Sequence, residues 1–270
     1  MGSTKKYNFK SLMPIIEETL RQAAAFPVAI KTADKIPLIS EVGERKYYDC
    51  KIDFYEEHFI VRTIHNFKAL AVLLPLMANV EEEKNLMHPV NLIMRNIITD
   101  FLTNSYLFKV FQKVCETGHK DYEPLKKVFR QMNYKVAKSA EEESKSNPKV
   151  TKELLRQYLP ENFNESGEII KEMALMYNVK EWFNQNEPEF KETIQNYYES
   201  YDKYFSKFEH ISFATPHFII QKNPFTEHCR AIGAGANQII ICYGVLDKKV
   251  DEDKILLLIN ELPNYTPPEL

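Results

Sequence analysis

Apolar residues along much of this chain recur at steps of three and four, the spacing that places them on one face of an α-helix. The clearest example is residues 89–112, where the repeated positions are Val90, Ile93, Met94, Ile97, Phe101 and Phe108. The same spacing predicts further helices over residues 11–25, 55–79, 121–143, 150–159, 168–184, 189–210 and 251–262. The fold is therefore expected to be mainly α, a bundle in which helices bury their apolar faces against one another.

Residues 36–55 show a different pattern, in which apolar and charged positions alternate. Tyr48, Cys50, Ile52 and Phe54 are separated by charged residues, and Gly43 precedes them at a turn-like position. Alternation with period two is typical of a strand, so we expect a small β-hairpin over residues 36–55, although helix stays open for residues 36–64. Residues 236–246, which include QIIICY, also fit either a short strand or a buried helix.

The order of these segments predicts three parts. Residues 1–54 would form an N-terminal helix and the hairpin, residues 55–215 a helical bundle, and residues 216–270 a C-terminal cap packed on the bundle. We expect the cap to be irregular because Pro216 and Pro224 interrupt the pattern there. Within the bundle, an acidic loop at residues 80–85 would join two long helices as an antiparallel hairpin.

Composition supports helix and narrows the cellular setting. Only 7 of 270 residues are glycine, and the net charge of -3 provides no general attraction to nucleic acid or anionic lipid, so any phosphate contact would be local. The cysteines form no CxxC pair, which argues for a reducing compartment; they are Cys50, Cys115, Cys229 and Cys242. Residues 69–77, the longest apolar run, are too short to cross a bilayer. We therefore expect a cytoplasmic protein with no membrane association.

Two segments carry a candidate catalytic site. Arg95 lies at the edge of the apolar stripe of residues 89–112, from which its guanidinium could reach a cleft and hold an anion. His210 lies late in another helix, with Lys203 upstream. RNA cleavage needs a proton donor or acceptor, a role for His210, and positive charge on phosphate, a role for Arg95 and Lys203. The alternative is that His210 stabilises a helix C-terminus and Arg95 pairs with a carboxylate.

With these residues, the segments NLIMRNIITDFLTNSYL and SKFEHIS resemble those of HEPN-like helical bundles, over residues 55–215. The resemblance implies an RNA-directed protein of a bacterial conflict or defence system, either a metal-independent ribonuclease or a degenerate RNA binder. In that superfamily the catalytic signature is an arginine followed, after four to six residues, by histidine. Here Lys203 and Lys207 precede His210 and no arginine does, so the resemblance leaves catalysis open.

A second cluster, His58, Arg62 and His65, has steps of four and three and shares one face if the segment is helical. Two histidines beside an arginine make a phosphate-binding cradle and a poor metal site, because the cation repels a metal ion. The alternative is a polar flank of a core helix. The sequence predicts no metal site, because its cysteines are unpaired. It also predicts no cofactor, since Gly233-Ala-Gly235-Ala lacks the third glycine of a dinucleotide-binding fingerprint.

Two alternative functions remain. The segment LLLINELPNY resembles the zinc-binding helix of gluzincin peptidases with Asn260 and Asn264 in place of both histidines, which implies an inactive relative. The second alternative is a non-catalytic helical module that binds a partner protein. The sequence leaves the oligomeric state open, a homodimer included.

Overall fold

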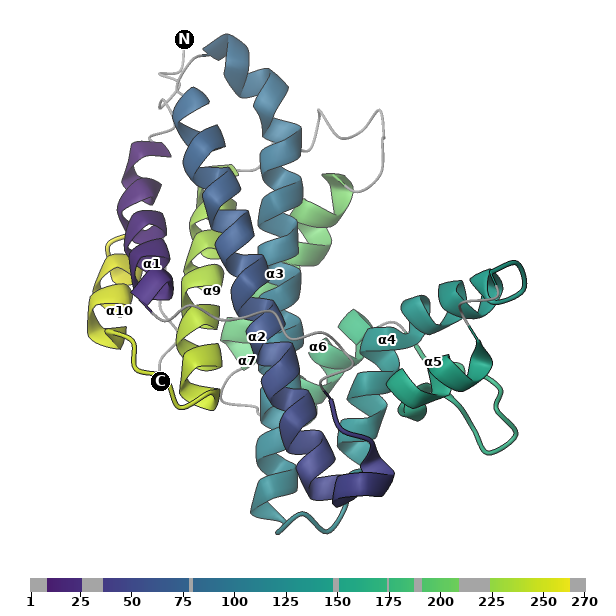
Figure 1. The fold of residues 1–270 in the computed structure, drawn as a ribbon. Helices are drawn as coiled ribbons and strands as arrows, with labels where there is room; N and C mark the ends of the chain where they lie inside the picture. Colours follow the sequence, from purple (N-terminus) through teal and green to yellow (C-terminus); the bar gives the residue numbers. More distant parts are fainter. Residues whose placement is uncertain are drawn as a thin grey trace. The chain divides into compact units, whose positions relative to one another are not determined.

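The computed structural model describes residues 9–25, 36–77, 80–147, 151–173, 175–186, 191–208 and 224–262. Helix dominates these residues, which confirms the mainly α prediction, and their only β-type pairing is an isolated bridge between Phe163 and Ile169 (Figure 1). The chain divides into two compact units. Unit 1 comprises Met1–Ile30, Tyr55–Asn104 and Glu187–Leu270, and unit 2 comprises Lys31–Phe54 and Ser105–Asn186.

Six of the described helices contribute to unit 1. They are α1 (Met13–Ala25), the later part of α2 (Ile39–Leu76), the earlier part of α3 (Val80–Glu116), α7 (Lys191–Glu199), α9 (Pro224–Val245) and α10 (Glu252–Asn260). A π-helix, Ser200–Tyr204, and a 3-10 turn, Phe205–Phe208, continue α7.

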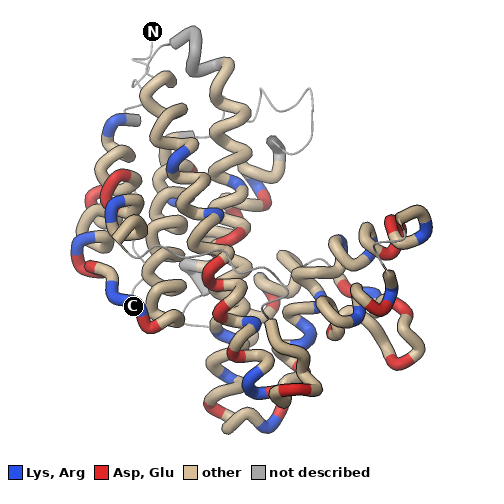
Figure 2. Tube along the Cα trace, in the orientation of Figure 1, with Lys and Arg blue, Asp and Glu red and all other residues tan. Residues whose placement is uncertain are grey.

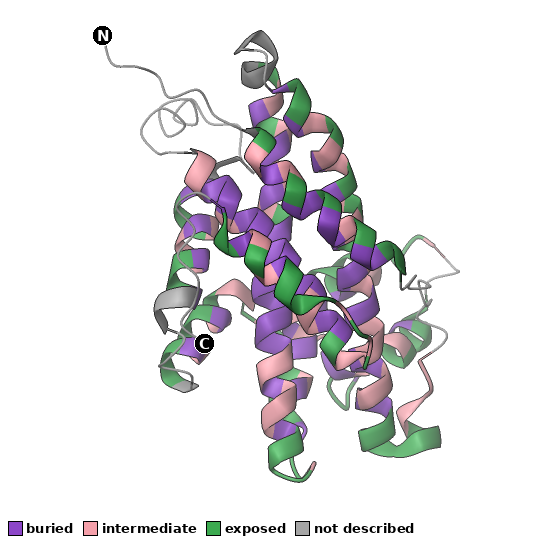
Figure 3. Ribbon diagram, turned by 90° about the vertical axis from the view of Figure 1, so that its left-hand side faces the viewer, coloured by how far each residue is buried: buried purple, intermediate pink, exposed green. Residues whose placement is uncertain are grey.

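Helix α9 forms the core of unit 1. It carries only two charged residues, Glu227 and Arg230, so its trace is almost entirely tan in Figure 2. Most of its residues from 227 to 243 are buried. Figure 3 shows in purple how buried residues gather in the interior of the helices. A Cβ atom built on Gly235 would lie 2.6 Å from the ring of Phe67 and 2.9 Å from Ile97. Only glycine therefore allows α9 to approach α2 and α3 this closely.

Helices α2 and α3 run antiparallel within unit 1, as predicted. Glu56 and Arg62 of α2 form hydrogen bonds with Asn104 and Asp100 of α3, respectively, so the later residue of one helix meets the earlier residue of the other. The predicted acidic loop at residues 80–85 is wrong, because α3 already begins at Val80. Acidic residues are favoured in the first turn of a helix by its dipole.

The predicted hairpin over residues 36–55 is also wrong, because residues 39–76 are helical. Gly43 has φ +78°, and the helix is kinked there instead of turning between two strands. The buried residues Tyr47, Tyr48, Lys51 and Ile52 are spaced as one helical face. Alternation appeared strand-like because Lys51 was counted as solvent-facing, whereas it is 1% exposed.

The C-terminal cap is regular where the structure describes it. The segment 236–246, for which the sequence fits either strand or helix, is helical up to residue 245, where α9 ends. Helix α10 packs against α1. The side-chain amide of Gln22 fixes this contact, since it donates to the carbonyl oxygen of Asp251 (3.2 Å) and accepts from its N–H (2.7 Å). Asp251 in turn caps the N-terminus of α10 through Lys254 N–H.

Unit 2 contains three further helices, α4 (Glu123–Glu143), α5 (Lys152–Tyr158) and α6 (Leu175–Asn186), together with the ends of α2 and α3 and the 3-10 turn Pro160–Asn162. Its core is aromatic: the ring of Tyr48 stacks on Tyr122 and Phe129 with centroid distances of 5.0 and 6.0 Å. Asn162 donates to the carbonyl oxygen of Arg130, which ties the 3-10 turn to α4.

These units divide the chain differently from the three parts expected. The expected boundary after residue 54 coincides with a unit boundary, residues 105–186 separate from 55–104, and the boundary at 215 lies outside the described residues. Among described helices, α2 alone is long and apolar enough to cross a membrane by length and composition. Core helices of soluble proteins meet the same criterion, and a third of that apolar stretch is buried in the fold.

Candidate functional site

The predicted phosphate-binding residues His58, Arg62 and His65 lie on one face of α2 in unit 1. The Arg62 side chain is 58% exposed, and its Nε donates to Oδ2 of Asp100 at 2.9 Å. Asp100 comes from α3 and is buried. Because Asp100 belongs to a different helix, the sequence pattern of α2 alone did not reveal this partner.

The bond between Arg62 and Asp100 defines the direction of the guanidinium. The pKa of Asp100 is raised to about 6, because the effect of burial outweighs the lowering effect of the nearby Arg62. Asp100 is therefore ionised at neutral pH and holds Nε, the inner nitrogen of the guanidinium. No described residue forms a hydrogen bond with the two outer nitrogens of Arg62. These outer nitrogens remain available to an anion from solvent.

The two histidines differ in their exposure. His65 is exposed one turn after Arg62, whereas His58 is half-buried one turn before it. Lys68 is also exposed and adds a positive charge at the edge of the same face. We call Arg62, His65 and Lys68 the Arg62 face.

Of the predicted catalytic residues, Arg95 and Lys203 lie in the described part of unit 1, and each contacts a different partner. The guanidinium carbon of Arg95 lies 5.5 Å from the ring centroid of Tyr201, a cation–π contact that holds the arginine in unit 1. Lys203 is exposed and pairs with Glu199, one helical turn earlier, at 2.8 Å. His210 lies outside the described residues.

Three aromatic residues in the helical segment before His210 belong to the core of unit 1. Tyr197, Tyr204 and Phe205 are buried, and the ring of Tyr197 contacts Phe101 edge-on at 5.0 Å. This segment therefore packs through its rings on α3.

Sequence reasoning missed a buried ion pair in unit 2. The Nζ atom of Lys51 donates to Oε2 of Glu161 at 2.6 Å and to the Tyr47 hydroxyl at 3.1 Å. The Tyr47 hydroxyl donates to the other carboxylate oxygen, Oε1, at 3.1 Å. Burial lowers the pKa of Lys51, although Glu161 raises it. The signal in the sequence is a lysine on the same helical face as two tyrosines.

Sequence reasoning also missed two polar contacts in the core of unit 1. The side-chain amide of Asn104 donates to Glu56 and to the sulfur of Cys242, and all three side chains are buried. Burial and the neighbouring Glu56 raise the pKa of the Cys242 thiol well above its ordinary value, so it is not a reactive thiolate. His228 contacts Asn91 elsewhere on α9 and α3.

No metal centre is formed by the described residues, among which no group of three or more His, Cys, Asp or Glu is positioned to hold an ion. In the gluzincin-like segment, α10 ends at Asn260, Glu261 lies just beyond the helix, and Asn264 is outside the described residues. Asn260 and Glu261 are both exposed.

Comparisons with known proteins identify no relative: no family model, no curated protein and no solved structure matches this chain.

Proposed function

We propose that the protein binds RNA through its phosphate groups at the Arg62 face of α2. The observation that carries this proposal is the anchoring of Arg62, whose inner nitrogen is held by the buried Asp100 while its outer nitrogens face solvent. An arginine fixed in this way can form two parallel hydrogen bonds with a phosphate without first losing side-chain freedom. The HEPN-like resemblance supports RNA as the polyanion.

A second arginine in unit 1, Arg21, shows how an arginine that binds a carboxylate with two nitrogens differs from Arg62. Arg21 of α1 is 61% exposed and also pairs with a largely buried carboxylate, Glu18. Its Nε and Nη2 bind the two oxygens of Glu18, so the arginine uses its paired donors within the protein. Arg62 uses only Nε. Of these two similarly exposed arginines, Arg62 is the one suited to bind phosphate.

Because the net charge is negative, RNA binding must depend on a local positive surface. With a net charge of -3, the protein does not attract RNA at long range, so affinity depends on contacts at the Arg62 face. Lys68 adds a point charge and His65 an imidazole donor along the same face. Such contacts fix the position of the backbone and confer little base specificity.

The proposal is tested by fluorescence anisotropy with a labelled single-stranded RNA at low salt. We expect Arg62→Ala to weaken binding about tenfold and to reduce the salt slope by about one, the change for one lost phosphate contact. Arg62→Lys should also weaken binding, because an ammonium does not reproduce the paired donors. Arg21→Ala is the matched control and should bind as the wild type does.

Three further measurements distinguish the alternatives. DNA of the same sequence tests whether the ribose hydroxyl contributes, and inorganic phosphate as competitor tests for a simple anion site. His210→Ala distinguishes a ribonuclease, which it would inactivate, from an RNA binder, in which neither form cuts RNA. If the wild type fails to bind at low salt, or Arg62→Ala binds equally well, the proposal is wrong and the helical interaction module is favoured.

A further inference from the structure

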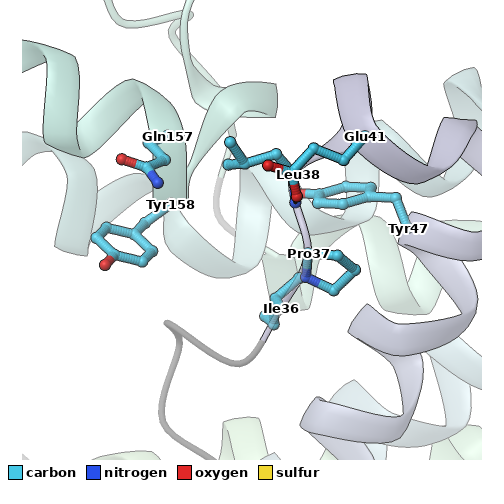
Figure 4. A pocket seen from close by; sticks show the side chains of 7 residues that line it. All are labelled: Ile36, Pro37, Leu38, Glu41, Tyr47, Gln157 and Tyr158. Atoms are coloured by element: carbon cyan, nitrogen blue, oxygen red, sulfur yellow. The ribbon is translucent and has the colours of Figure 1, made fainter.

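A cavity of about 270 Å³ opens in unit 2 and shares no residue with the Arg62 face (Figure 4). One wall consists of the residues that lead into α2, Ile36, Pro37 and Leu38, together with Glu41 and Tyr47. Gln157 and Tyr158, the last residues of α5, lie across the opening (Figure 4). The volume is just below the range of roughly 300–1,000 Å³ for pockets that hold drug-sized ligands.

The side of the cavity that Tyr47 forms is fixed by buried hydrogen bonds. The hydroxyl of Tyr47 is fixed between Lys51 and Glu161, which are themselves joined at 2.6 Å and almost completely buried. The ring of Tyr47 contacts Tyr48 edge-on at 5.0 Å, which limits its rotation. The Tyr47 ring is therefore preorganised as part of the cavity before any ligand enters.

The charge of the residues that line the cavity favours a positively charged ligand. Glu41 is the one ionisable acid among the seven residues that line the cavity, and none of the seven is a lysine, arginine or histidine. Glu41 forms no ion pair with a described residue, and its one hydrogen bond is a long one, 3.4 Å, from the N–H of Leu38. The exposed Glu41 carboxylate therefore has no charged partner among the described residues, and two phenol rings, Tyr47 and Tyr158, line the same cavity.

A second cavity in unit 2 serves as a contrast. It is lined by acids and bases together, and its Arg130 pairs with Glu123 and with Glu172. Charges in that cavity are balanced within the protein. The cavity at Glu41 instead combines one unbalanced negative charge, aromatic faces and an apolar wall, which is the combination that binds organic cations.

We propose that this cavity binds a compact organic ammonium ion with an apolar group. The ammonium group lies between Glu41 and the rings of Tyr47 and Tyr158, and the apolar group lies against Ile36, Pro37 and Leu38. This site uses none of the residues assigned to RNA, so either proposal can fail without the other.

The proposal is tested by calorimetric titration of the full chain with 2-phenylethylamine. The matched neutral probe is 2-phenylethanol, and the matched anion is 3-phenylpropionate. We expect saturable binding of the amine, at least about tenfold weaker binding of the alcohol and no binding of the anion, because only the amine pairs with the carboxylate. Glu41→Gln preserves the shape of the site and should weaken amine binding about tenfold.

Glu153→Gln is the control for that variant, because Glu153 is an exposed acid of α5 that does not line the cavity. It should bind the amine as the wild type does, and Tyr158→Ala should bind it more weakly. Fluorescence of Trp182, the only tryptophan of the chain, reports that unit 2 is folded in each variant. Absence of saturable amine binding, equal affinity for the alcohol, or a change of less than about threefold in Glu41→Gln would each overturn the proposal.

Discussion

The Nε2 atom of His228 lies 2.8 Å from Oδ1 of Asn91, and both side chains are fully buried in unit 1. An amide oxygen only accepts hydrogen bonds, so Nε2 carries the proton of a neutral imidazole. Burial lowers the pKa of His228 to about 3. The α9–α3 contact is therefore built for an uncharged histidine.

This contact predicts sensitivity to acid. A histidine in the unfolded chain binds a proton near pH 6.5, whereas His228 in the fold does so only near pH 3. The unfolded state thus binds more protons between these values, and stability falls as the pH is lowered through them. Between pH 7 and 5 this group contributes a loss of about 2 kcal/mol.

We expect His228→Gln to lack that loss, because its amide can donate to Asn91 and does not titrate. The measurement is urea unfolding by circular dichroism at pH 7 and 5, compared as the difference between variant and wild type since other groups titrate in the same range. His65→Gln, an exposed position of unit 1, is the control. Identical pH dependence in His228→Gln and the wild type would contradict the assignment.

Asp100 predicts the opposite pH dependence. Its pKa is about 6 in the fold against 3.8 for the ordinary group, so the folded state binds more protons between these values and stability falls as the pH rises through them. Asp100→Asn cannot ionise and still accepts from Arg62. We expect this variant to be more stable than the wild type at pH 7, by about 1–3 kcal/mol. Thermal melts across pH 4–7 measure this, with the exposed Asp253→Asn as control; lower stability of Asp100→Asn at pH 7 would count against it.

The buried pair of Lys51 and Glu161 predicts non-additive mutations in unit 2. Lys51→Met or Glu161→Gln alone leaves one buried group without its charged partner and should cost about 3–5 kcal/mol. The double variant should cost clearly less than the sum of the two. Trp182 fluorescence in urea follows unit 2 selectively.

The control for this cycle is the more exposed pair of Lys126 and Glu44, whose side chains are 26% and 49% exposed and which has a similar distance of 2.8 Å. Lys126→Met should cost less than about 1 kcal/mol, because water screens the pair. Additive costs for Lys51→Met and Glu161→Gln would show that the two groups are not coupled.

Two glycines of α9 predict opposite effects of alanine. Gly235→Ala places a methyl group 2.6 Å from Phe67 and should destabilise unit 1 by about 1–3 kcal/mol. Gly244→Ala meets no atom within 4 Å and should stabilise the helix by about 0.5–1 kcal/mol. Chemical unfolding of the two variants followed by circular dichroism compares them directly, and a stabilised Gly235→Ala would show that α9 does not pack as described.

Much of the helical fold was predictable because local periodicity reports which face of a helix is buried. The repeat that predicts α4 includes Leu125, Val128 and Phe129, and all three are completely buried. The placement of His58, Arg62 and His65 on one face of α2 was also predictable from helical spacing, whereas Lys68 was not part of that prediction.

The partners of these residues were not predictable in the same way. Asp100 is 38 positions from Arg62, and Glu161 is 110 positions from Lys51, so no local spacing relates them. The hairpin expected over residues 36–55 was wrong for this reason: Lys51 is buried, and the distant Glu161 supplies the negative charge that makes its burial tolerable.

The sequence by itself determined that the chain folds mainly into helices, because apolar periodicity and scarce glycine act through local geometry. Tertiary structure decided which polar residues lie inside and what they contact. The free energy of a buried charge depends on the group opposite it, and that group is supplied by a distant part of the chain. Gly235 is a second example. In the sequence it belongs only to an incomplete dinucleotide-binding fingerprint, whereas in the structure the ring of Phe67 leaves no room for a larger residue.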